Sequence, residues 1–342
     1  MDMAEGMGGR KTLAVYVGPH LAFGKFAQEA GAETFRIGPR AEKKQPAPIK
    51  ALNFAKSALS IPPGYDLYLT ETCYYYAAAA KRLGRIRGRI ASVCSSPVFY
   101  NMLHGMIGGI ERAMLLELAK DVDFFVLEGK YVGDVMRKLG IEKPSCLAYT
   151  YVGRERYETL RRMKPDLKSK EIAIIATNDY LYKGVDLLIE AVTLARKKDP
   201  GISLNVVVGN MDEGKISGLL SENMRMTHDA VSALSKAGLY VHPARGDVFP
   251  VAPLEAMLAG VPTMVSSETG TKEVVWKVRP DFVLPLEPEK IAAKINEYFT
   301  LSSAEKNGLS EKFRKAALPF NEKEQLAFFR KNYSEMLEKL GI

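Results

Sequence analysis

The chain has 342 residues, of which 47% are hydrophobic and 26% charged, so it is long enough for two globular domains of ordinary size. No apolar run approaches the roughly 20 residues that span a bilayer, and the amino-terminal segment lacks the apolar core of a signal peptide. The three cysteines, at positions 73, 94 and 146, show no CxxC spacing, and the four histidines are not closely spaced. These patterns argue against a disulfide framework, a structural zinc site and a histidine-rich metal site, and they fit the reducing cytoplasm.

The formal net charge is +8, and residues 1–150 carry +6 of it, with 20 lysines and arginines against 14 aspartates and glutamates. Part of this excess is a basic run in the segment AAAAKRLGRIRGRIA. Such a run is compatible with a solvated helix end, a nucleic-acid patch or a surface that meets anionic lipid headgroups. The chain has no recognisable nucleic-acid module, which disfavours the second interpretation. The third predicts association with the inner face of the membrane. The residues that would contact lipid are Lys81, Arg82, Arg85, Arg87 and Arg89.

Short apolar runs alternate with helical patterns through the first half of the chain. We expect strands over 12–17, 34–37, 66–70, 90–94 and 123–127, and helices over 20–30, 53–59, 72–83 and 132–140, with a loop over 39–50. This alternation predicts a parallel sheet wrapped by helices. Ligands of such sheets bind at the carboxyl ends of the strands, which makes His20, Glu71, Ser95 and Ser96 candidate ligand-contacting residues.

The segment 96–114, SPVFYNMLHGMIGGIERAM, is rich in Phe, Tyr, Met and Gly. One interpretation is a flexible loop that runs into a helix. The other is an adaptable apolar loop that accommodates a lipid-linked acceptor, because Met and aromatic side chains adjust to apolar ligands. His104 is its only imidazole. This histidine is either structural or a catalytic residue that contacts the transferred sugar or donates to the departing phosphate.

The pattern breaks into a basic, polar stretch over 145–170, which we interpret as the domain boundary. A second alternation follows, with strands predicted over 171–176, 203–208, 239–242, 263–266 and 282–284, and helices over 187–197, 230–237, 289 onward and 322–340. The sequence therefore predicts a domain over 1–155, a linker over 156–170 and a second doubly wound domain over 171–315. We expect the closing helical segment, 316–342, to pack back on the first domain.

One stretch of the second half, GDVFPVAPLEAMLAGVPTMVSSETGTKEVV at 246–275, has the outline of a polar-ligand site. A nearly all-apolar helix is expected to start near Pro253, with Glu255 in its first turn, where the helix dipole favours a carboxylate. Asp247 lies eight positions earlier, in the loop that leads into this helix. Two acids thus flank a run of amides that suits a phosphate or a sugar hydroxyl.

This stretch resembles the acid-x7-acid signature of the retaining glycosyltransferases of family 4, which have the GT-B fold. The family text runs like E-G-F-G-L-V-P-L-E-A-M-A-C-G-T-P-V-V, and this chain reads D-V-F-P-V-A-P-L-E-A-M-L-A-G-V-P-T-M. A second stretch, ATNDYLYKGVDLLIEAV, resembles the G-R-x4-K-G-V-D-x-L-I-x-A-F motif, in which a Lys and an Arg hold the donor diphosphate. Lys183 occupies the Lys position, while Asn178 stands where the family has Arg. Arg245 and Lys272 are the cations that could replace this Arg.

Other positions also depart from the family pattern. The first acid is Asp247 rather than Glu, and Gly18-Pro19-His20 replaces the usual Gly-Gly. A Ser at 95 or 96 stands where members often have His. The resemblance is strong over 178–275 and only architectural over 1–150.

The resemblance implies an α/β protein of GT-B fold, with two Rossmann-like doubly wound domains that face each other across a cleft. Glu255 would accept hydrogen bonds from the ribose hydroxyls, and Lys183 would offset charge on the diphosphate as the glycosidic bond breaks. Asp247 and the amides of 248–251 would orient the sugar. The residues implied in donor binding are Asn178, Lys183, Gly209, Arg245, Asp247, Val248, Phe249, Val251 and Glu255.

The implied reaction moves a sugar from a UDP- or GDP-linked donor to a lipid-linked or saccharide acceptor. It retains the anomeric configuration, needs neither a cofactor nor a divalent metal, and requires no general base. Three alternatives stay open: a hydrolase or epimerase on the same fold, a catalytically silent nucleotide-sugar-binding protein, and a basic RNA-binding protein whose affinity would fall steeply with salt.

Overall fold

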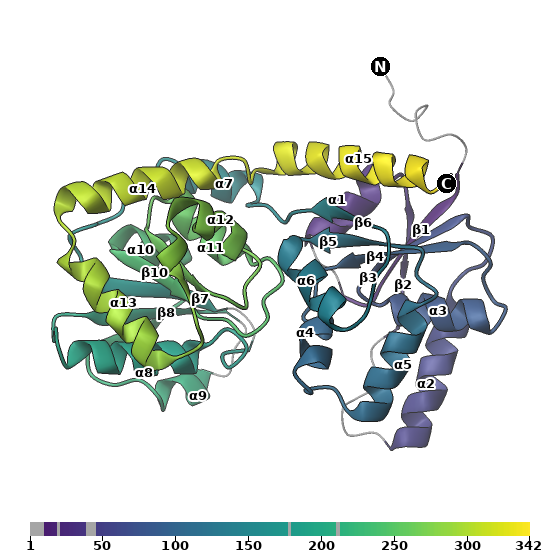
Figure 1. Ribbon diagram of the computed structural model, residues 1–342, viewed down its shortest axis with the longest axis horizontal. Helices are drawn as coiled ribbons and strands as arrows, with labels where there is room; N and C mark the ends of the chain where they lie inside the picture. Colours follow the sequence, from purple (N-terminus) through teal and green to yellow (C-terminus); the bar gives the residue numbers. More distant parts are fainter. Residues whose placement is uncertain (1–9, 19–20, 39–45, 177–178, 210–212) are drawn as a thin grey trace. The chain divides into compact units, whose positions relative to one another are not determined.

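The computed structural model describes residues 10–18, 21–38, 46–176, 179–209 and 213–342 (Figure 1). The chain forms two compact units, of which the first comprises Met1–Tyr149 and Gln325–Ile342 and the second Thr150–Glu324. Each unit holds a six-stranded parallel sheet with helices on both faces. The predicted fold class, two Rossmann-like doubly wound domains, is therefore confirmed.

The sheet of the first unit has the order β2-β1-β3-β4-β5-β6. Its strands are β1 (Thr12–Tyr16), β2 (Glu33–Arg36), β3 (Leu67–Glu71), β4 (Arg89–Cys94), β5 (Phe124–Glu128) and β6 (Ser145–Ala148). Its helices are α1 (Leu21–Glu29), α2 (Ala47–Ser60), α3 (Tyr74–Arg82), α4 (Val98–Leu103), α5 (Gly109–Ala119), α6 (Lys130–Lys138) and most of α15 (Glu322–Lys339). Helices α2 to α6 cover one face of the sheet, and α1 and α15 cover the other (Figure 1).

The last helix of the chain, α15, is fixed to the first unit by apolar and polar contacts. Phe329 is fully buried and stacks on Phe26 of α1, with 4.5 Å between the ring centroids. Arg330 pairs with Glu29 at 2.7 Å, and the Asn332 amide donates to the Leu147 carbonyl at 3.0 Å. An aromatic pair of this kind contributes about 0.5–1.5 kcal/mol beyond the area that it buries.

The sheet of the second unit has the order β12-β11-β10-β7-β8-β9. Its strands are β7 (Glu171–Ala176), β8 (Ser203–Val208), β9 (Met224–Thr227), β10 (Leu239–His242), β11 (Thr263–Ser266) and β12 (Val283–Leu284). Its helices are α7 (Arg154–Leu160), α8 (Val185–Arg196), α9 (Glu213–Ser217), α10 (Ala230–Lys236), α11 (Val251–Leu258), α12 (Lys272–Val278), α13 (Pro288–Thr300) and α14 (Ser303–Ala317), and the short 3-10 helix η2 covers Pro280–Phe282.

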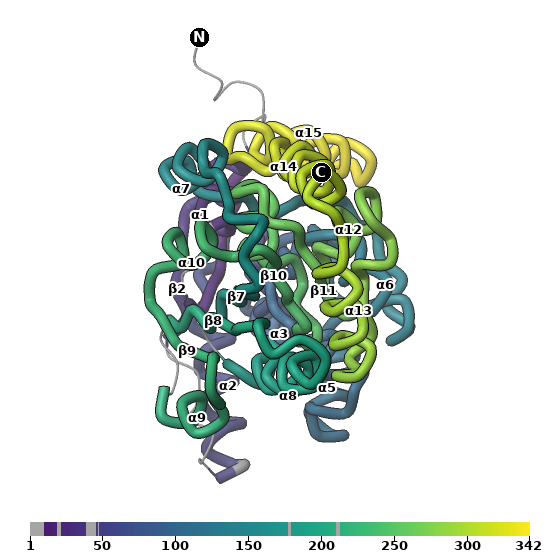
Figure 2. The backbone as a smooth tube through the Cα atoms, turned by 90° about the vertical axis from the view of Figure 1, so that its left-hand side faces the viewer, coloured from purple at the N-terminus to yellow at the C-terminus, as the bar shows by residue number. Residues whose placement is uncertain are grey.

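Two helix layers bury this second sheet. Helices α8 and α13 pack side by side on one face, and α14 packs on α11 and α12 on the other (Figures 1 and 2). Strands β7 and β8, read as EIAIIA and SLNVVV, are almost wholly buried because both of their faces meet helices. Continuous apolar runs are what a parallel sheet covered on both sides requires.

Several predicted boundaries were wrong, each for a local reason. The loop predicted over 39–50 was extended too far, because α2 already begins at Ala47 and carries Pro48 in its first turn, where proline is tolerated. The segment 96–114 forms two helices, α4 and α5, rather than one loop and a helix. Strands β6 and β9 were missed because SCLA and MRMT are short edge strands without an apolar run. Residues 156–170, predicted as a linker, belong to the second unit and contain most of α7.

Candidate functional site

The acid and the lysine singled out by the two motifs lie at the carboxyl ends of adjacent strands. Lys183 precedes α8 in the connection from β7, and Asp247 follows β10, which pairs with β7. From β7 the chain continues through α8 to β8, toward one edge of the sheet. From β10 it continues through α11 to β11, toward the opposite edge. The strand order thus reverses between β7 and β10, which is where doubly wound sheets bind their ligands.

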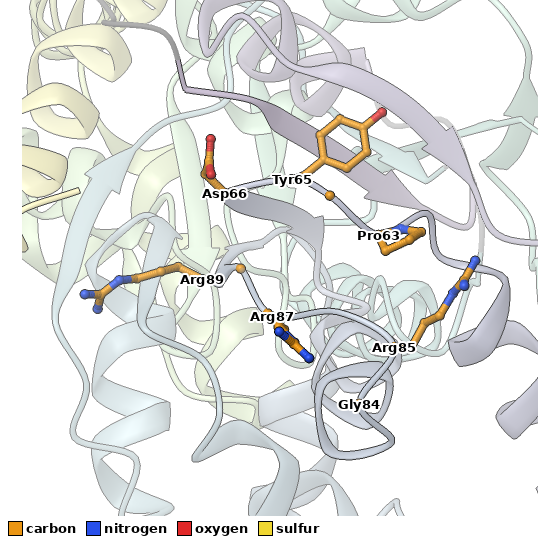
Figure 3. A pocket seen from close by; sticks show the side chains of 9 residues that line it. Pro63, Tyr65, Asp66, Gly84, Arg85, Arg87 and Arg89 are labelled. Atoms are coloured by element: carbon orange, nitrogen blue, oxygen red, sulfur yellow. The ribbon is translucent and has the colours of Figure 1, made fainter.

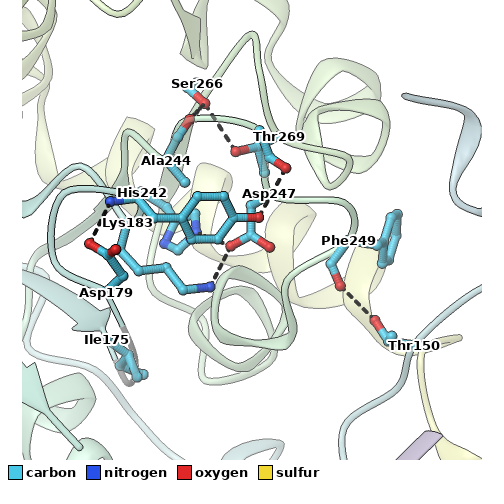
Figure 4. A network of polar contacts seen from close by, with 12 residues as sticks. Thr150, Ile175, Asp179, Lys183, His242, Ala244, Asp247, Phe249, Ser266 and Thr269 are labelled. Atoms are coloured by element: carbon cyan, nitrogen blue, oxygen red, sulfur yellow. Dashed lines mark hydrogen bonds and ion pairs between the residues drawn. The ribbon is translucent and has the colours of Figure 1, made fainter. Parts of the chain in front are cut away.

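Asp247 and Lys183 form a buried ion pair (Figure 4). The Lys183 ammonium donates to Asp247 Oδ2 at 2.6 Å, and their side chains are 13% and 11% exposed. Burial alone would raise the pKa of Asp247, but the Lys183 charge and a hydrogen bond from His242 outweigh it, so this pKa lies below its ordinary value. Asp247 is therefore a carboxylate at neutral pH.

His242, the last residue of β10, is a member of this network that sequence analysis missed. Its ring is fully buried, with Nε2 at 3.1 Å from Asp247 Oδ2 and Nδ1 at 3.3 Å from the Tyr240 hydroxyl. Burial lowers the pKa of His242 more than Asp247 raises it, so the imidazole is neutral at neutral pH. The available signal was a polar residue at the end of the otherwise apolar run LYVH, five positions before the acid.

Glu255 lies two residues further into its helix than expected. Helix α11 begins at Val251 rather than Pro253, so Pro253 is its third residue and Glu255 its fifth, outside the first turn. The side chain instead accepts a hydrogen bond from Arg156 Nε of α7 at 3.0 Å. Burial raises the pKa of Glu255, and the Arg156 charge opposes that rise. Arg156 was missed because its basic stretch was assigned to a linker.

Hydrogen bonds from two other segments of the chain hold the loop between Asp247 and α11. The Thr150 hydroxyl donates to the Phe249 carbonyl at 2.7 Å (Figure 4), and the Gly270 amide donates to the Asp247 carbonyl at 2.8 Å. A Cβ at Gly270 would collide with the carbonyl oxygen of Val248, so glycine is required for the two loops to approach. Val248 and Phe249 are buried and Val251 is half-buried, which fixes the backbone that was predicted to orient the sugar.

Lys183 is positioned by an equally tight contact. Gly184 adopts the left-handed conformation with φ of 73°, and a Cβ there would collide with the Pro243 carbonyl. The Tyr182 hydroxyl donates to the Gly246 carbonyl at 2.9 Å, so the turn before α8 is bonded to the loop after β10. The close approach of these two backbone segments therefore brings Lys183 to Asp247.

The other cations considered for the diphosphate have partners within the second unit. Arg245 makes two hydrogen bonds to the Asp186 carboxylate of α8, both at 2.8 Å, and Lys272 donates to the Ser267 carbonyl at 2.6 Å. Gly209 is exposed directly after β8, and Asn178 lies outside the described residues. Arg245 and Lys272 are thus bonded to groups other than Lys183 and Asp247.

Among the candidates of the first unit, Glu71 and Ser95 come together at the carboxyl ends of β3 and β4. The Ser95 hydroxyl lies 3.5 Å from Glu71 Oε1, and burial raises the pKa of Glu71 to about 7 despite that hydrogen bond. His104 is exposed at the end of α4 and packs on Tyr100, with 4.1 Å between the ring centroids. His20 lies outside the described residues. The catalytic role suggested for His104 stays a prediction.

Three residues of the basic run, Arg85, Arg87 and Arg89, line a pocket of about 530 Å³ at the amino-terminal ends of β3 and β4 (Figure 3). Its lining residues are Pro63, Gly64, Tyr65, Asp66, Gly84, Arg85, Arg87, Gly88 and Arg89. Part of the positive charge is neutralised locally, because Lys81 and Arg89 pair with Asp123, and Arg82 pairs with Asp121 and Glu117. Arg85 donates to the Ile61 carbonyl at 3.2 Å but stays exposed, as does Arg87. The pocket is thus cationic mainly through Arg85 and Arg87.

The described residues contain neither a cluster of metal-ligating side chains nor a membrane-spanning helix. Within ranges 10–18, 21–38, 46–176, 179–209 and 213–342, no group of three or more His, Cys, Asp or Glu side chains could hold a metal ion. In the same part of the chain no helix combines the length and apolar character needed to cross a bilayer.

Part of the second unit matches a known protein family. Residues 169–300 match the family model described as "Glycosyl transferases group 1". No curated protein sequence matches the chain.

Solved structures match both units at low sequence identity. Sucrose-phosphate synthase from Thermosynechococcus elongatus has a TM-score of 0.67 and 15% identity, and the match covers 96% of this chain and 100% of that one. Anabaena HepE in complex with UDP and glucose has a TM-score of 0.65 and 14% identity, covering 96% and 99% of the two chains. A glycosyltransferase from Rickettsia africae has a TM-score of 0.63 and 14% identity, covering 97% and 99%.

These matches agree with the motifs around Lys183, Asp247 and Glu255, and with the two parallel sheets of the structure. Residues 169–300 are therefore similar in sequence to the glycosyl transferases group 1 family, and the chain has the GT-B fold of two Rossmann-like domains.

Proposed function

We propose that this protein is a retaining glycosyltransferase that moves a sugar from a nucleotide-diphosphate donor to an acceptor hydroxyl. The observation that carries the proposal is the buried Lys183–Asp247 pair at the carboxyl ends of β7 and β10, within the residues that match the group 1 family. An ammonium held at a fixed point in a site of low dielectric stabilises charge that develops on a leaving diphosphate. The pair therefore suits departure of a phosphorylated leaving group.

Each of the three motif residues has a distinct proposed role. The Lys183 ammonium has three donor hydrogens, of which one bonds Asp247 and the others can meet phosphate oxygens. Asp247 and the rigid loop after it orient the transferred sugar. Glu255 accepts hydrogen bonds from the paired hydroxyls of the ribose. The leaving diphosphate lies on the face that the acceptor attacks, so the anomeric configuration is retained and no general base is assigned.

A UDP- or GDP-linked sugar is the proposed donor, and the HepE complex with UDP-glucose favours the uridine form. The proposed acceptor is lipid-linked or a saccharide. No cofactor or divalent metal is assigned, because the charge that offsets the diphosphate is assigned to Lys183. Each of these choices is open to a direct binding measurement.

The test is a calorimetric titration of the protein with UDP, GDP and ADP, first in EDTA and then with magnesium. We expect one nucleotide to saturate the site in EDTA, and the same donor series to support transfer of a labelled sugar to a lipid or oligosaccharide acceptor. Binding that requires magnesium would contradict the metal-free site. Release of free sugar or an epimer without acceptor would favour a hydrolase or epimerase, and binding without turnover on any acceptor would favour a silent binding protein. No binding of any nucleotide would overturn the proposal.

We also propose that the pocket of Figure 3 contacts anionic lipid headgroups. Support comes from Arg85 and Arg87, which are exposed, and from Leu83, which is 57% exposed beside them. An apolar side chain among cations is compatible with a surface that meets both headgroups and the upper part of the lipid layer. Arg89 contributes less, because its guanidinium pairs with Asp123 at 3.3 Å.

Replacing Arg85 and Arg87 together by Gln should weaken binding to vesicles of anionic phospholipid by about 30-fold. This estimate takes about 1 kcal/mol for each cation near the surface. Vesicle sedimentation at fixed ionic strength measures the effect. The matched control is Lys197→Gln with Lys198→Gln, which removes the same charge from exposed positions at the end of α8. An equal loss in both variants would assign the binding to net charge, and unchanged binding of the arginine variant would remove the membrane contact.

A further inference from the structure

We propose that His242 is a positioning residue of the donor site, which holds Asp247 in the orientation and ionisation state that the transfer requires. This inference rests on the proposed function. Neither motif includes His242, which is the last residue of β10. Its role follows from the contacts that its two ring nitrogens make.

The hydrogen bonds that link Ile175, Tyr240, His242 and Asp247 have a single consistent direction. Asp247 is ionised and its carboxylate can only accept, so a neutral His242 that bonds Oδ2 at 3.1 Å carries its proton on Nε2. His242 Nδ1 is then an acceptor, and the Tyr240 hydroxyl donates to it at 3.3 Å. The Tyr240 oxygen in turn accepts from the Ile175 amide at 3.4 Å. His242 therefore donates to Asp247, and Tyr240 supports the same tautomer.

The surroundings keep this direction fixed. Tyr240 and His242 are both fully buried, so neither exchanges its partner for water. Burial raises the pKa of Tyr240 and lowers the pKa of His242, which keeps both groups neutral. The charged groups that act on the two rings are Asp247, Lys183 and Glu255, all of them in the second unit.

Two donors from different directions converge on one oxygen of Asp247. The Lys183 ammonium and His242 Nε2 both bond Oδ2, so the carboxylate cannot rotate and the direction of Oδ1 is fixed. Without His242, Lys183 alone would bond the carboxylate, and a single flexible ammonium does not fix its plane. A carboxylate that must meet sugar hydroxyls loses catalytic efficiency when its orientation is not held.

The experiment compares His242→Leu with His242→Gln in wild-type background. Leucine removes both ring nitrogens, whereas the Gln amide can still donate to Asp247. We expect the leucine variant to lose about 10- to 100-fold in kcat, the range for a lost hydrogen bond to a charged group. The KM for the donor should change little, because His242 bonds Asp247, whereas nucleotide contacts are assigned to Glu255 and Lys183. The glutamine variant should keep most of the activity.

The pH profile gives a readout that a purely structural role would not move. Asp247 has a depressed pKa, and removing the His242 donor raises that pKa. The acidic limb of kcat, measured at saturating donor so that loss of nucleotide binding through Glu255 does not contribute, should therefore move to higher pH in His242→Leu and stay in place in His242→Gln. A leucine variant with the wild-type rate and pH profile would overturn the inference while leaving the proposed function intact.

The ligand-free protein offers a second measurement that needs no activity. Long-range nitrogen–proton NMR of protein labelled on its histidines, with His242→Gln for assignment, should find His242 neutral and protonated on Nε2 at neutral pH, with a pKa below that of an ordinary histidine. This measurement uses the wild-type protein, so it tests the inference even if His242→Leu does not fold. A proton on Nδ1, or titration at the ordinary histidine pKa, would overturn the inference. Absence of nucleotide binding by the wild type would instead overturn the proposed function, and the role of His242 with it.

Discussion

Replacing Lys183 by Ala is expected to lower the turnover number by 100-fold or more at saturating donor. Loss of one preorganised electrostatic stabiliser typically costs about 10²–10³ in kcat. In this site Lys183 is 13% exposed and its ammonium lies 2.6 Å from Asp247, so its charge acts in a largely water-excluded environment. The affinity for the free nucleoside diphosphate should fall less than turnover, because charge accumulates on the diphosphate only as the glycosidic bond breaks.

The ion pair complicates this experiment, and a double variant resolves the complication. Removing Lys183 leaves the buried carboxylate of Asp247 without its cation, which costs about 3–5 kcal/mol of folding stability. Lys183→Met with Asp247→Asn removes both charges and should recover most of the melting temperature without recovering turnover. A double variant that regains wild-type turnover would show that Lys183 only neutralises Asp247, and would contradict its assignment to the diphosphate.

The central strands of the second unit were predictable because their residues form continuous apolar runs, which indicate burial. Strands β7, β8, β10 and β11 were predicted at their observed bounds, since each is a short apolar run closed by a turn signal. The motifs also singled out Lys183 and Asp247, which are 64 positions apart and which the fold brings within 2.6 Å. Local patterning and one long-range resemblance were sufficient for these features.

The partners of the site residues were not predictable in the same way. Arg156 lies 99 positions before Glu255, in a basic stretch that looked like a linker, and only the packing of α7 against α11 brings it there. His242 looked like the end of a buried strand, and its role depends on the direction of a hydrogen-bond chain that begins at Ile175. Periodicity reports which face of an element is buried, but it does not report which polar atoms meet across two elements.

Replacing Glu255 by Gln is expected to weaken nucleotide binding by about 100-fold, which corresponds to losing one charged acceptor of two hydroxyl hydrogen bonds. Calorimetry with the preferred nucleoside diphosphate measures this effect at pH 8. The neighbouring Arg156 does not contact ribose in this assignment, so Arg156→Ala tests whether Glu255 acts through its charge. An E255Q variant with unchanged nucleotide affinity would eliminate the ribose assignment.

The pH dependence separates the two variants. Burial raises the pKa of Glu255 and Arg156 opposes that rise, so wild-type affinity should fall as the pH drops through a pKa above the ordinary glutamate value. Removing Arg156 raises this pKa further, so the fall should begin at higher pH in Arg156→Ala, and affinity should recover in more alkaline buffer. Glu255→Gln should stay weak and independent of pH over the same range. If Arg156→Ala were as weak as Glu255→Gln at every pH, Arg156 itself would contact the nucleotide, and the carboxylate would serve to position that arginine.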